Sequence, residues 1–239
     1  MHSQQQAYMI ASLSRLLRDG ETAFHGLASP LPMVAILHAQ ATHAPHLTYL
    51  NIAGSVNPKP LTLPHSTVDP HLLPGTGSLF ALVDIFDLAA RGRLDNVFLS
   101  GVQIDRKGRI NMSFIGPVAQ PKVRLPGGAG SAFLMQKAKR VLLWKTKHDR
   151  RSLVPEVSFC TASPACETYL VTPLCIFKLF DHELRVASIH PYSSLAEIQA
   201  NTGWQIRCTP DCALTPPLAP ADYELIERID PGGVVAIEF

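Results

Sequence analysis

Residues 127–140 combine a flexible backbone with positive charge. The stretch begins with Gly127-Gly128-Ala129-Gly130-Ser131, and Lys137, Lys139 and Arg140 follow. Glycine lets a backbone approach a ligand closely, and the N–H groups that begin a helix favour negative charge. The stretch could therefore wrap an anionic ligand. The alternative is an ordinary glycine-rich turn between a strand and a helix, which many α/β proteins contain.

Two amide side chains flank a second turn. Gln103 and Asn111 stand on either side of Asp105-Arg106-Lys107-Gly108, where aspartate begins the turn and glycine accepts its positive φ. This pattern predicts a hairpin. The two amides either hydrogen-bond across the hairpin or face a ligand, and the residues alone leave both roles open.

A short polar cluster has the residue types of a hydrolase triad. His65, Ser66 and Asp69 lie close together in the sequence. A triad depends on the spatial alignment of nucleophile, base and acid, which sequence proximity does not supply. We therefore do not assign a triad to this cluster.

Cysteine spacing bears on metal binding. Cys208 and Cys212 could share an ion, but Cys160 and Cys166 are spaced too widely for a usual second pair of ligands. We predict no metal site. The odd, scattered set of five cysteines predicts reduced, buried thiols instead.

The elements that would position these residues alternate between strand and helix. Apolar, β-prone stretches predict buried strands at 47–52, 97–99 and 141–144, and helical spacing predicts helices at 9–17, 33–37 and 78–91, the last of them buried. This alternation predicts an α/β fold with an open, mostly parallel sheet flanked by helices. The pattern then turns β-rich, with strands at 168–172, 174–179 and 185–190. We predict a single domain over residues 1–239, with a β-rich C-terminal extension from about 165 to 239.

Composition excludes several classes of protein. The chain has 239 residues and a formal net charge of +2, with no run of Lys and Arg, so we expect no nucleic-acid binding. No stretch approaches the roughly 20 apolar residues of a membrane span, so we expect no membrane segment. Residues 1–6 lack the basic and apolar regions of a signal peptide, which predicts a cytoplasmic location.

Six segments carry a family resemblance. Residues 101–111 match Gly-x-Gln-Ile-Asp-x-x-Gly-x-x-Asn, and residues 121–130 match Pro-Lys-x-Arg-x-x-Gly-x-Gly-Gly except that Gly128 and Ala129 break the glycine phasing. Residues 148–151 correspond to a shortened His-Glu-Lys-Arg-Arg segment, which we expect to be a solvated loop or a subunit contact. Residues 191–194, 201–203 and 229–232 also fit. In this order the segments resemble the β subunits of family I coenzyme A (CoA) transferases such as glutaconate CoA-transferase, from about Ala23 onwards.

The resemblance fails at the family's reactive residue. In this family a glutamate carboxylate attacks the acyl-CoA thioester, and anhydride and enzyme–CoA thioester intermediates follow. The resemblance places that glutamate in a Glu-x-Gly segment at the end of a strand, which here reads Ile52-Ala53-Gly54. Isoleucine has no carboxylate to act as nucleophile and leaving group. We therefore predict no catalytic residue on this chain by the family mechanism.

The resemblance has further implications for fold, partner and ligand. It implies the CoA-transferase fold, which is NagB/RpiA-like, and an α-like partner subunit in a heterodimer or heterotetramer. It also implies a CoA thioester as substrate, with no permanently bound cofactor. The residues implied to bind CoA or substrate are Ala53, Gly54, Gly101, Gln103, Asn111, Gly127, Gly128, Ala129 and Gly130.

Three functions remain open with Ile52 at the glutamate position. The chain could serve a CoA-transferase-like enzyme that uses another mechanism. It could belong to a CoA-ester hydrolase of the steroid ring-cleaving type, in which the resemblance implies an essential carboxylate on the α subunit. It could also be a non-catalytic subunit that binds CoA esters or acts as a scaffold.

Overall fold

The chain divides into two compact units. The computed structural model describes residues 2–239. Unit 1 comprises residues 1–98 and 217–239, and unit 2 comprises residues 99–216. The end of the predicted C-terminal extension thus belongs to unit 1, because the chain returns there after residue 216. A single domain over residues 1–239 stays a prediction.

Unit 1 is built on three parallel strands. β1 (Thr22–His25) pairs with β2 (Thr48–Asn51) on one side and with β5 (Asn96–Leu99) on the other. Two short antiparallel strands, β3 (Ser55–Val56) and β4 (Ser78–Leu79), continue the sheet beyond β2. Because β1 and β2 are parallel, their carboxyl ends, His25 and Asn51, lie at the same edge of the sheet.

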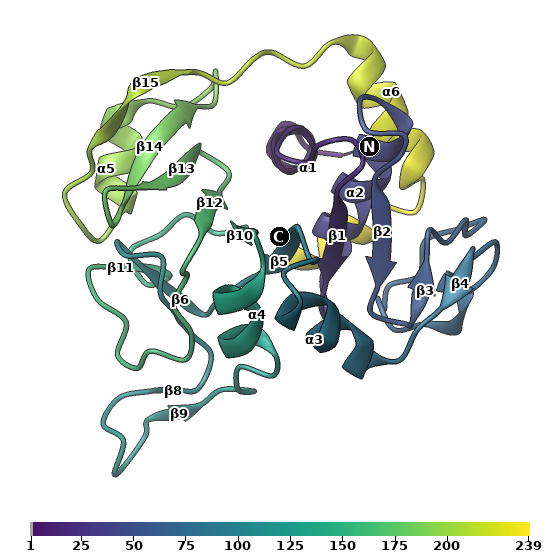
Figure 1. Ribbon diagram of the computed structural model, residues 1–239. Helices are drawn as coiled ribbons and strands as arrows, with labels where there is room; N and C mark the ends of the chain where they lie inside the picture. Colours follow the sequence, from purple (N-terminus) through teal and green to yellow (C-terminus); the bar gives the residue numbers. More distant parts are fainter. Residues whose placement is uncertain (1) are drawn as a thin grey trace. The chain divides into compact units, whose positions relative to one another are not determined.

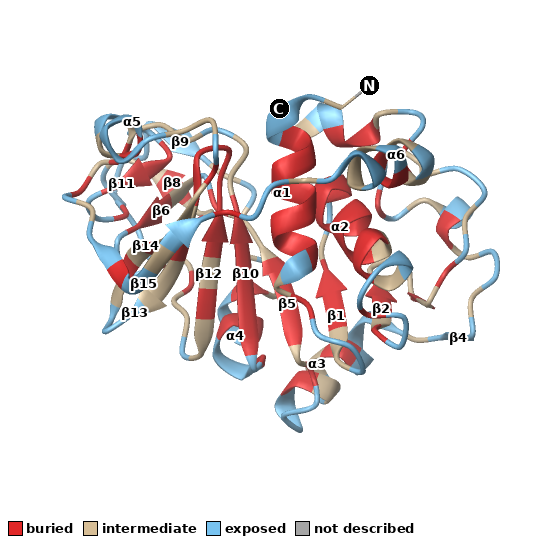
Figure 2. Cartoon of the chain, turned by 90° about the horizontal axis from the view of Figure 1, so that it is seen from above, coloured by how far each residue is buried: buried red, intermediate tan, exposed pale blue. Residues whose placement is uncertain are grey.

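Helices of unit 1 differ strongly in burial. α1 (Gln4–Arg15) begins with a reciprocal capping box between Ser3 and Gln6, and α2 (Pro30–Ala41) begins with a proline. Both helices are largely buried, whereas α3 (Leu82–Ala90) is mostly exposed and buries only Ile85 and Ala89 (Figure 2). The predicted buried helix at 78–91 is therefore wrong about burial, because within this chain only one narrow side of α3 is covered. It is also wrong about the start of the helix, because residues 78–79 pair with β3 as β4.

The end of the chain completes unit 1. α6 (Pro220–Ile229) packs against α2 although almost two hundred residues separate them (Figure 1). Two short 3-10 helices, η1 (Pro70–Leu72) and η2 (Val234–Glu238), complete the helical elements of this unit. The side chain of Glu238 accepts a hydrogen bond from the Leu31 N–H at 2.7 Å, which fixes η2 at the start of α2.

Unit 2 mixes parallel and antiparallel strands. β10 (Arg140–Trp144) is parallel to β12 (Glu167–Val171), which continues antiparallel through β13 (Cys175–Phe180) to β14 (Glu183–Ile189), and β15 (Cys208–Leu214) is parallel to β14. α4 (Ser131–Lys137) and α5 (Leu195–Asn201) complete this part. The predicted strands at 141–144, 168–172, 174–179 and 185–190 are confirmed within one or two residues.

Two small sheets also belong to unit 2. β6 (Gln103–Asp105) pairs with β7 (Ile110–Asn111) across the predicted hairpin, and β11 (Leu153–Val154) lies on its other side. β8 (Phe114–Ile115) and β9 (Val123–Arg124) form a separate hairpin. The predicted α/β fold class, a mostly parallel sheet flanked by helices, is confirmed.

The five cysteines differ in their exposure to solvent. Of the five cysteines only Cys175 is buried, and Cys160 and Cys208 are exposed. The expectation of buried thiols is thus wrong for most of them, because Cys160 lies in a loop and Cys208 begins β15 at the edge of its sheet.

Within residues 2–239, no helix combines the length and the apolar character needed to cross a membrane. A cytoplasmic location stays a prediction.

Candidate functional site

The turn that carries Ile52 follows the carboxyl end of β2. Gly54 has a φ of +94°, and a Cβ on it would lie 2.8 Å from the carbonyl oxygen of Phe80. Only glycine fits there without strain. The Ala53 N–H donates to the Asn51 Oδ1 at 2.7 Å, and the Gly54 N–H donates to the Asn51 carbonyl at 2.9 Å. Asn51 thus engages both N–H groups, and Ile52 stands half-buried at the corner of the turn.

A chain of buried hydrogen bonds lies behind this turn. The Asn51 Nδ2 donates to the Tyr49 Oη at 2.6 Å, and the Tyr49 Oη lies 2.5 Å from the His25 Nε2. The His25 Nδ1 lies 2.7 Å from the Ser29 Oγ. The side chains of His25, Ser29, Tyr49 and Asn51 have no exposure to solvent. We call this set the buried relay.

One arrangement of protons gives every donor in the buried relay an acceptor. An amide Nδ2 can only donate, so the Tyr49 hydroxyl accepts from Asn51 and donates its own proton to the His25 Nε2. The proton of the neutral imidazole is therefore on Nδ1 and is donated to the Ser29 Oγ. The Ser29 hydroxyl donates to the Gly26 carbonyl at 2.5 Å. Each donor thus has an acceptor.

Electrostatics keep the buried relay neutral. Burial lowers the pKa of His25 to about 4, because the imidazolium ion would lose its hydration. Burial also raises the pKa of the Tyr49 hydroxyl well above its ordinary value. Near neutral pH both groups therefore stay uncharged, which is the state that the hydrogen-bond directions require.

The buried relay ties together three loops at one edge of the unit 1 sheet. The Thr67 hydroxyl donates to the Gly26 carbonyl at 3.2 Å, which joins residues 65–69 to the loop that follows β1. The turn at 52–54 is joined to the same loop through Asn51, Tyr49 and His25. In open α/β sheets, ligands bind beyond the carboxyl ends of the parallel strands. This edge is therefore the candidate functional site of unit 1.

No carboxylate occurs in the sequence of the turn itself. Glu21 precedes β1 and so lies at the opposite, amino edge of the sheet, where its Oε2 accepts from the Asn96 Nδ2 at 2.9 Å. Asp69 binds His71, with 2.6 Å between its Oδ1 and the His71 Nδ1. Asp69 is thus turned to His71 and not to His65, so the residues at 65–69 are not arranged as a triad.

Gln103 and Asn111 hydrogen-bond across their hairpin in unit 2. The Asn111 Nδ2 donates to the Gln103 Oε1 at 2.8 Å and to the Phe114 carbonyl at 2.9 Å. The Ser158 hydroxyl also donates to the Gln103 Oε1, at 2.9 Å. Of the two roles left open by the sequence, the structural one is present. Contact of either amide with a ligand stays a prediction.

The glycine loop of unit 2 is closely packed. The Gly127 N–H donates to the Met112 carbonyl at 2.7 Å, and a Cβ on Gly128 would lie 2.5 Å from the Thr161 Cγ2. Ala129 has a φ of 44°, which is unusual for a residue with a side chain. Gly101 is similarly constrained, since a Cβ there would lie 2.8 Å from the Gln103 carbonyl oxygen. These contacts explain Gly101 and Gly128 sterically, and the φ of +95° at Gly127 favours glycine there. Gly130 is the N-cap residue of α4.

Several residues have environments that sequence reasoning missed. The sequence signal for His25 and Tyr49 is weak, because each is one polar ring on a short strand that also carries threonine. His148, in the segment expected to be a solvated loop or a subunit contact, is half-buried in unit 2, with its Nδ1 2.9 Å from the Thr172 Oγ1 and its Nε2 2.9 Å from the Thr202 Oγ1. Burial lowers the pKa of His148 to about 4.

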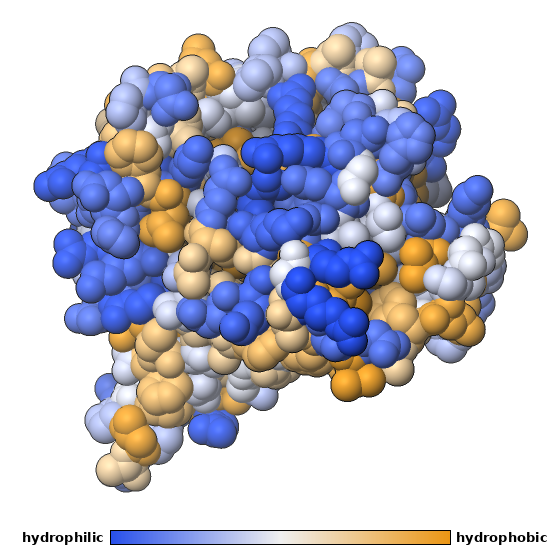
Figure 3. Space-filling view, in the orientation of Figure 1, coloured by the Kyte–Doolittle hydropathy of each residue, from blue (hydrophilic) through white to orange (hydrophobic). Residues whose placement is uncertain are grey.

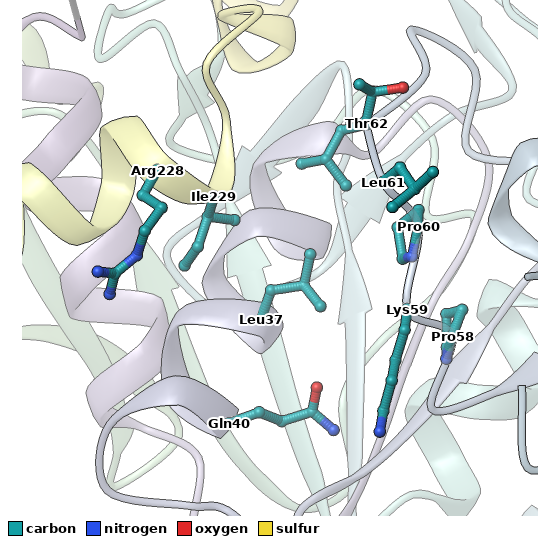
Figure 4. A pocket seen from close by; sticks show the side chains of 10 residues that line it. Leu37, Gln40, Pro58, Lys59, Pro60, Leu61, Thr62, Arg228 and Ile229 are labelled. Carbon is teal, nitrogen blue, oxygen red and sulfur yellow. The ribbon is translucent and has the colours of Figure 1, made fainter. Parts of the chain in front are cut away.

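A surface hollow of about 280 Å³ lies elsewhere in unit 1. α2, α6 and the segment 58–63 form its walls, and Lys59 and Arg228 supply its positive charge (Figure 4). None of the predicted site residues lines it. Over residues 2–239, no three His, Cys, Asp or Glu side chains are grouped so that they could hold a metal ion.

Comparison with known proteins decides the family. The model of the family described as "Coenzyme A transferase" matches residues 7–201. The chain belongs to the coenzyme A transferase family. The resemblance inferred from the ordered segments is thereby confirmed. The β subunit of the 3-oxoadipate CoA-transferase of Pseudomonas knackmussii is 31% identical over 235 residues, which cover 91% of this chain and 88% of that protein.

The names of other proteins similar to this chain describe different reactions. The decarboxylase AibA/AibB has a solved structure with a chain that is 35% identical, covers 98% of both chains and has a TM-score of 0.93. The IpdB subunit of the cholesterol ring-cleaving hydrolase of Rhodococcus jostii is 28% identical over 158 residues, 59% of this chain and 60% of that protein. Glutaconate CoA-transferase of Acidaminococcus fermentans is 21% identical with a TM-score of 0.84, covers 97% of this chain and 96% of its own, and shows the fold alone.

Proposed function

We propose that this chain is the β subunit of a two-subunit enzyme that acts on a CoA thioester without a glutamyl-CoA intermediate. The observation that carries the proposal is Ile52, an aliphatic side chain at the corner of the turn where the family resemblance places the nucleophile. A side chain without a carboxylate cannot form an acyl anhydride. An α-like subunit would supply the acidic or basic groups that this turn lacks.

Exposed apolar side chains support a protein partner. Leu79 is 68% exposed, Leu82 51% and Val83 68%. They belong to β4 and the first turn of α3, and apolar side chains are visible on this part of unit 1 in Figure 3. Soluble monomers rarely leave such side chains together in water, since their burial is favourable. We call these three residues the apolar patch, and an α-like subunit is the partner we propose for it.

Decarboxylation is the reaction that the comparisons favour. The chain of the decarboxylase AibA/AibB is 35% identical over 98% of this chain. When the carboxyl group of an acyl-CoA is β to the thioester carbonyl, or conjugated to it through a double bond, loss of CO2 leaves an electron pair that the carbonyl can accept, and a proton then replaces the carboxyl group. This reaction requires no covalent nucleophile. It requires donors for the thioester oxygen and poor hydration of the carboxylate, which an aliphatic side chain such as Ile52 promotes.

Hydrolysis of a CoA ester is the second candidate. It is favoured by the 28% identity to the IpdB subunit of the cholesterol ring-cleaving hydrolase, over 158 residues. In that case a water molecule would attack, and the base that activates it would come from the α-like subunit. A non-catalytic role in CoA-ester binding is the remaining alternative.

One experiment separates these reactions. The purified complex of this chain with its α-like partner is incubated with a set of acyl-CoA thioesters that carry a free carboxylate, with and without an acceptor acid. CO2, free CoA thiol and new CoA esters are measured together. We expect CO2 without thiol release and without need of an acceptor. Thiol release identifies a hydrolase, acceptor-dependent CoA transfer refutes the proposal, and the absence of any product identifies a binding subunit.

A further inference from the structure

A second hollow, of about 220 Å³, lies on the surface of unit 2 and is distinct from the glycine loop. Three connections between strands supply its lining. Arg106 and Lys107 come from the turn between β6 and β7. His182 ends the turn between β13 and β14, Glu183 is the first residue of β14, and Arg207 directly precedes β15. Four of these five side chains can carry positive charge. We call this site the basic hollow.

Backbone hydrogen bonds fix these connections to one another. The Leu184 N–H donates to the Arg106 carbonyl at 2.6 Å, and the Val186 N–H donates to the Arg207 carbonyl at 2.8 Å. The side chain of Asp105 accepts the Lys107 N–H at 2.9 Å and holds the first turn in shape. The positions from which the charged side chains extend are therefore preorganised, which lowers the entropic cost of binding a ligand.

The surrounding carboxylates are already engaged by arginines outside the basic hollow. Asp105 lies 2.6 Å from the Arg109 Nη2, and Glu156 binds the same nitrogen at 3.0 Å. Asp181 lies 3.1 Å from the Arg185 Nη2. These pairs leave the cations of the hollow without close neutralising partners on the neighbouring turns.

Glu183 is the carboxylate that lines the basic hollow, and it neutralises only part of the charge. Its Oε2 lies 3.7 Å from the Arg207 Nη1. Arg106 and Lys107 form no ion pair with any residue from 2 to 239, although their positive charges contribute to the lowered pKa of Glu156. Three permanent cations and one carboxylate give a net charge of +2. Like charges gathered in this way repel one another, and an anion would relieve the repulsion.

We propose that the basic hollow binds a phosphate group. A phosphate monoester carries about −1.5 to −2 charges near pH 7, which matches the net charge of the lining. Arg106 and Arg207 extend from different connections, and guanidinium groups bind phosphate oxygens in a bidentate manner. The phosphate could be free inorganic phosphate or the 3′-phosphate of a CoA molecule, and only the second source rests on the proposed function.

Calorimetry on the full chain at constant ionic strength tests the site. The ligands are inorganic phosphate, CoA and dephospho-CoA, which lacks the 3′-phosphate. We expect saturable phosphate binding that weakens about 10-fold in Arg106→Gln and in Lys107→Gln, because each loses a charge-assisted hydrogen bond. Arg150→Gln is the matched control, because it removes an exposed arginine of the same unit outside the basic hollow and should bind phosphate as the native chain does.

The outcomes decide whether the basic hollow binds phosphate and whether that phosphate is free or part of CoA. If CoA binds more tightly than dephospho-CoA and Arg106→Gln abolishes the difference, the phosphate belongs to CoA. If both forms of CoA bind alike and inorganic phosphate still saturates, the source is free phosphate. The proposal is overturned if phosphate binding does not saturate, or if Arg150→Gln weakens it as much as Arg106→Gln does. Thermal unfolding of each variant verifies that the chain is folded.

Discussion

Tyr49 and Asn51 lie two residues apart on β2, and the Asn51 Nδ2 donates to the Tyr49 Oη at 2.6 Å. Residues at this spacing on a strand point to the same side of the sheet. Here that side is closed, so both polar groups must find partners within the protein. They find each other and His25, and the other end of the Asn51 amide holds the turn beside Ile52.

Removal of one hydroxyl from the buried relay tests its influence on the turn. Tyr49→Phe removes the 2.6 Å acceptor of the Asn51 Nδ2 and leaves the two groups only their long mutual contact, 3.4 Å between the Asn51 Nδ2 and the His25 Nε2. We expect the free energy of unfolding to fall by about 1–3 kcal/mol, the usual cost of an unsatisfied buried polar group. Urea denaturation measures it, and kcat/KM of the complex should fall as well because the turn loses its fixed geometry.

Ser14→Ala provides the control. It removes the buried hydrogen bond between the Ser14 Oγ and the His38 Nδ1, 2.9 Å long and also in unit 1. We expect a comparable loss of stability with kcat/KM unchanged. If this variant lowers kcat/KM as much as Tyr49→Phe does, the buried relay has no special relation to the site.

The buried imidazole of His25 makes the free energy of unfolding depend on pH. Its pKa is lowered to about 4 from the ordinary value of 6.5. As the pH falls from about 6.5 towards 4, the unfolded chain takes up a proton that the folded chain resists, so the free energy of unfolding decreases over this window. His25→Gln should therefore show a shallower decrease than the native chain in urea unfolding between pH 8 and pH 4. Parallel curves for the two proteins would contradict this prediction.

The steric constraint at Gly54 predicts a substitution effect. Gly54→Ala introduces a Cβ 2.8 Å from the Phe80 carbonyl oxygen at a φ of +94°. Gly92 also has a positive φ, +67°, but a Cβ there would have open space around it. We expect Gly92→Ala to lose about 1–2 kcal/mol from its positive φ alone, and Gly54→Ala to lose more. Equal losses in thermal unfolding would show that the contact with Phe80 is relieved without cost.

A carboxylate placed at position 52 tests whether this position corresponds to the nucleophile of the family. We expect Ile52→Glu, in the complex with its partner, to form an enzyme–CoA thioester that borohydride or hydroxylamine traps, and we expect the native chain to form none. Ile52→Gln is the control of equal size without the nucleophile. Mass spectrometry of the treated chain gives the result. A trapped adduct on an acidic residue of the native chain would refute the assignment of Ile52.

Charge on the apolar patch should weaken assembly. Val83 is 68% exposed on α3, so Val83→Glu should leave the fold of this chain intact and prevent the α-like subunit from burying the patch. Size-exclusion chromatography of the co-expressed subunits measures the complex. Val118→Glu, at a position that is 70% exposed in unit 2, is the control. A stable complex with Val83→Glu would place the interface on another surface.

Patterns of neighbouring residues in the sequence were sufficient to predict much of the fold. The hairpin at 105–108 follows from an aspartate and a glycine at fixed positions, and the strand at 141–144 follows from four consecutive apolar residues. Both depend on backbone preference and on burial along one stretch of chain. The helix at 78–91 shows the limit, because apolar residues predict a buried face without indicating whether this chain or another protein covers it.

The sequence by itself determined the family and the absence of a carboxylate at the turn, because ordered motifs and the identity of residue 52 need no coordinates. Only the tertiary structure decided that His25, Tyr49 and Asn51 form one relay and that the His148 ring lies between the hydroxyls of Thr172 and Thr202. These relationships depend on which residue of one strand lies beside which residue of another. Such register is set by packing of the whole sheet, and no local pattern of residues records it.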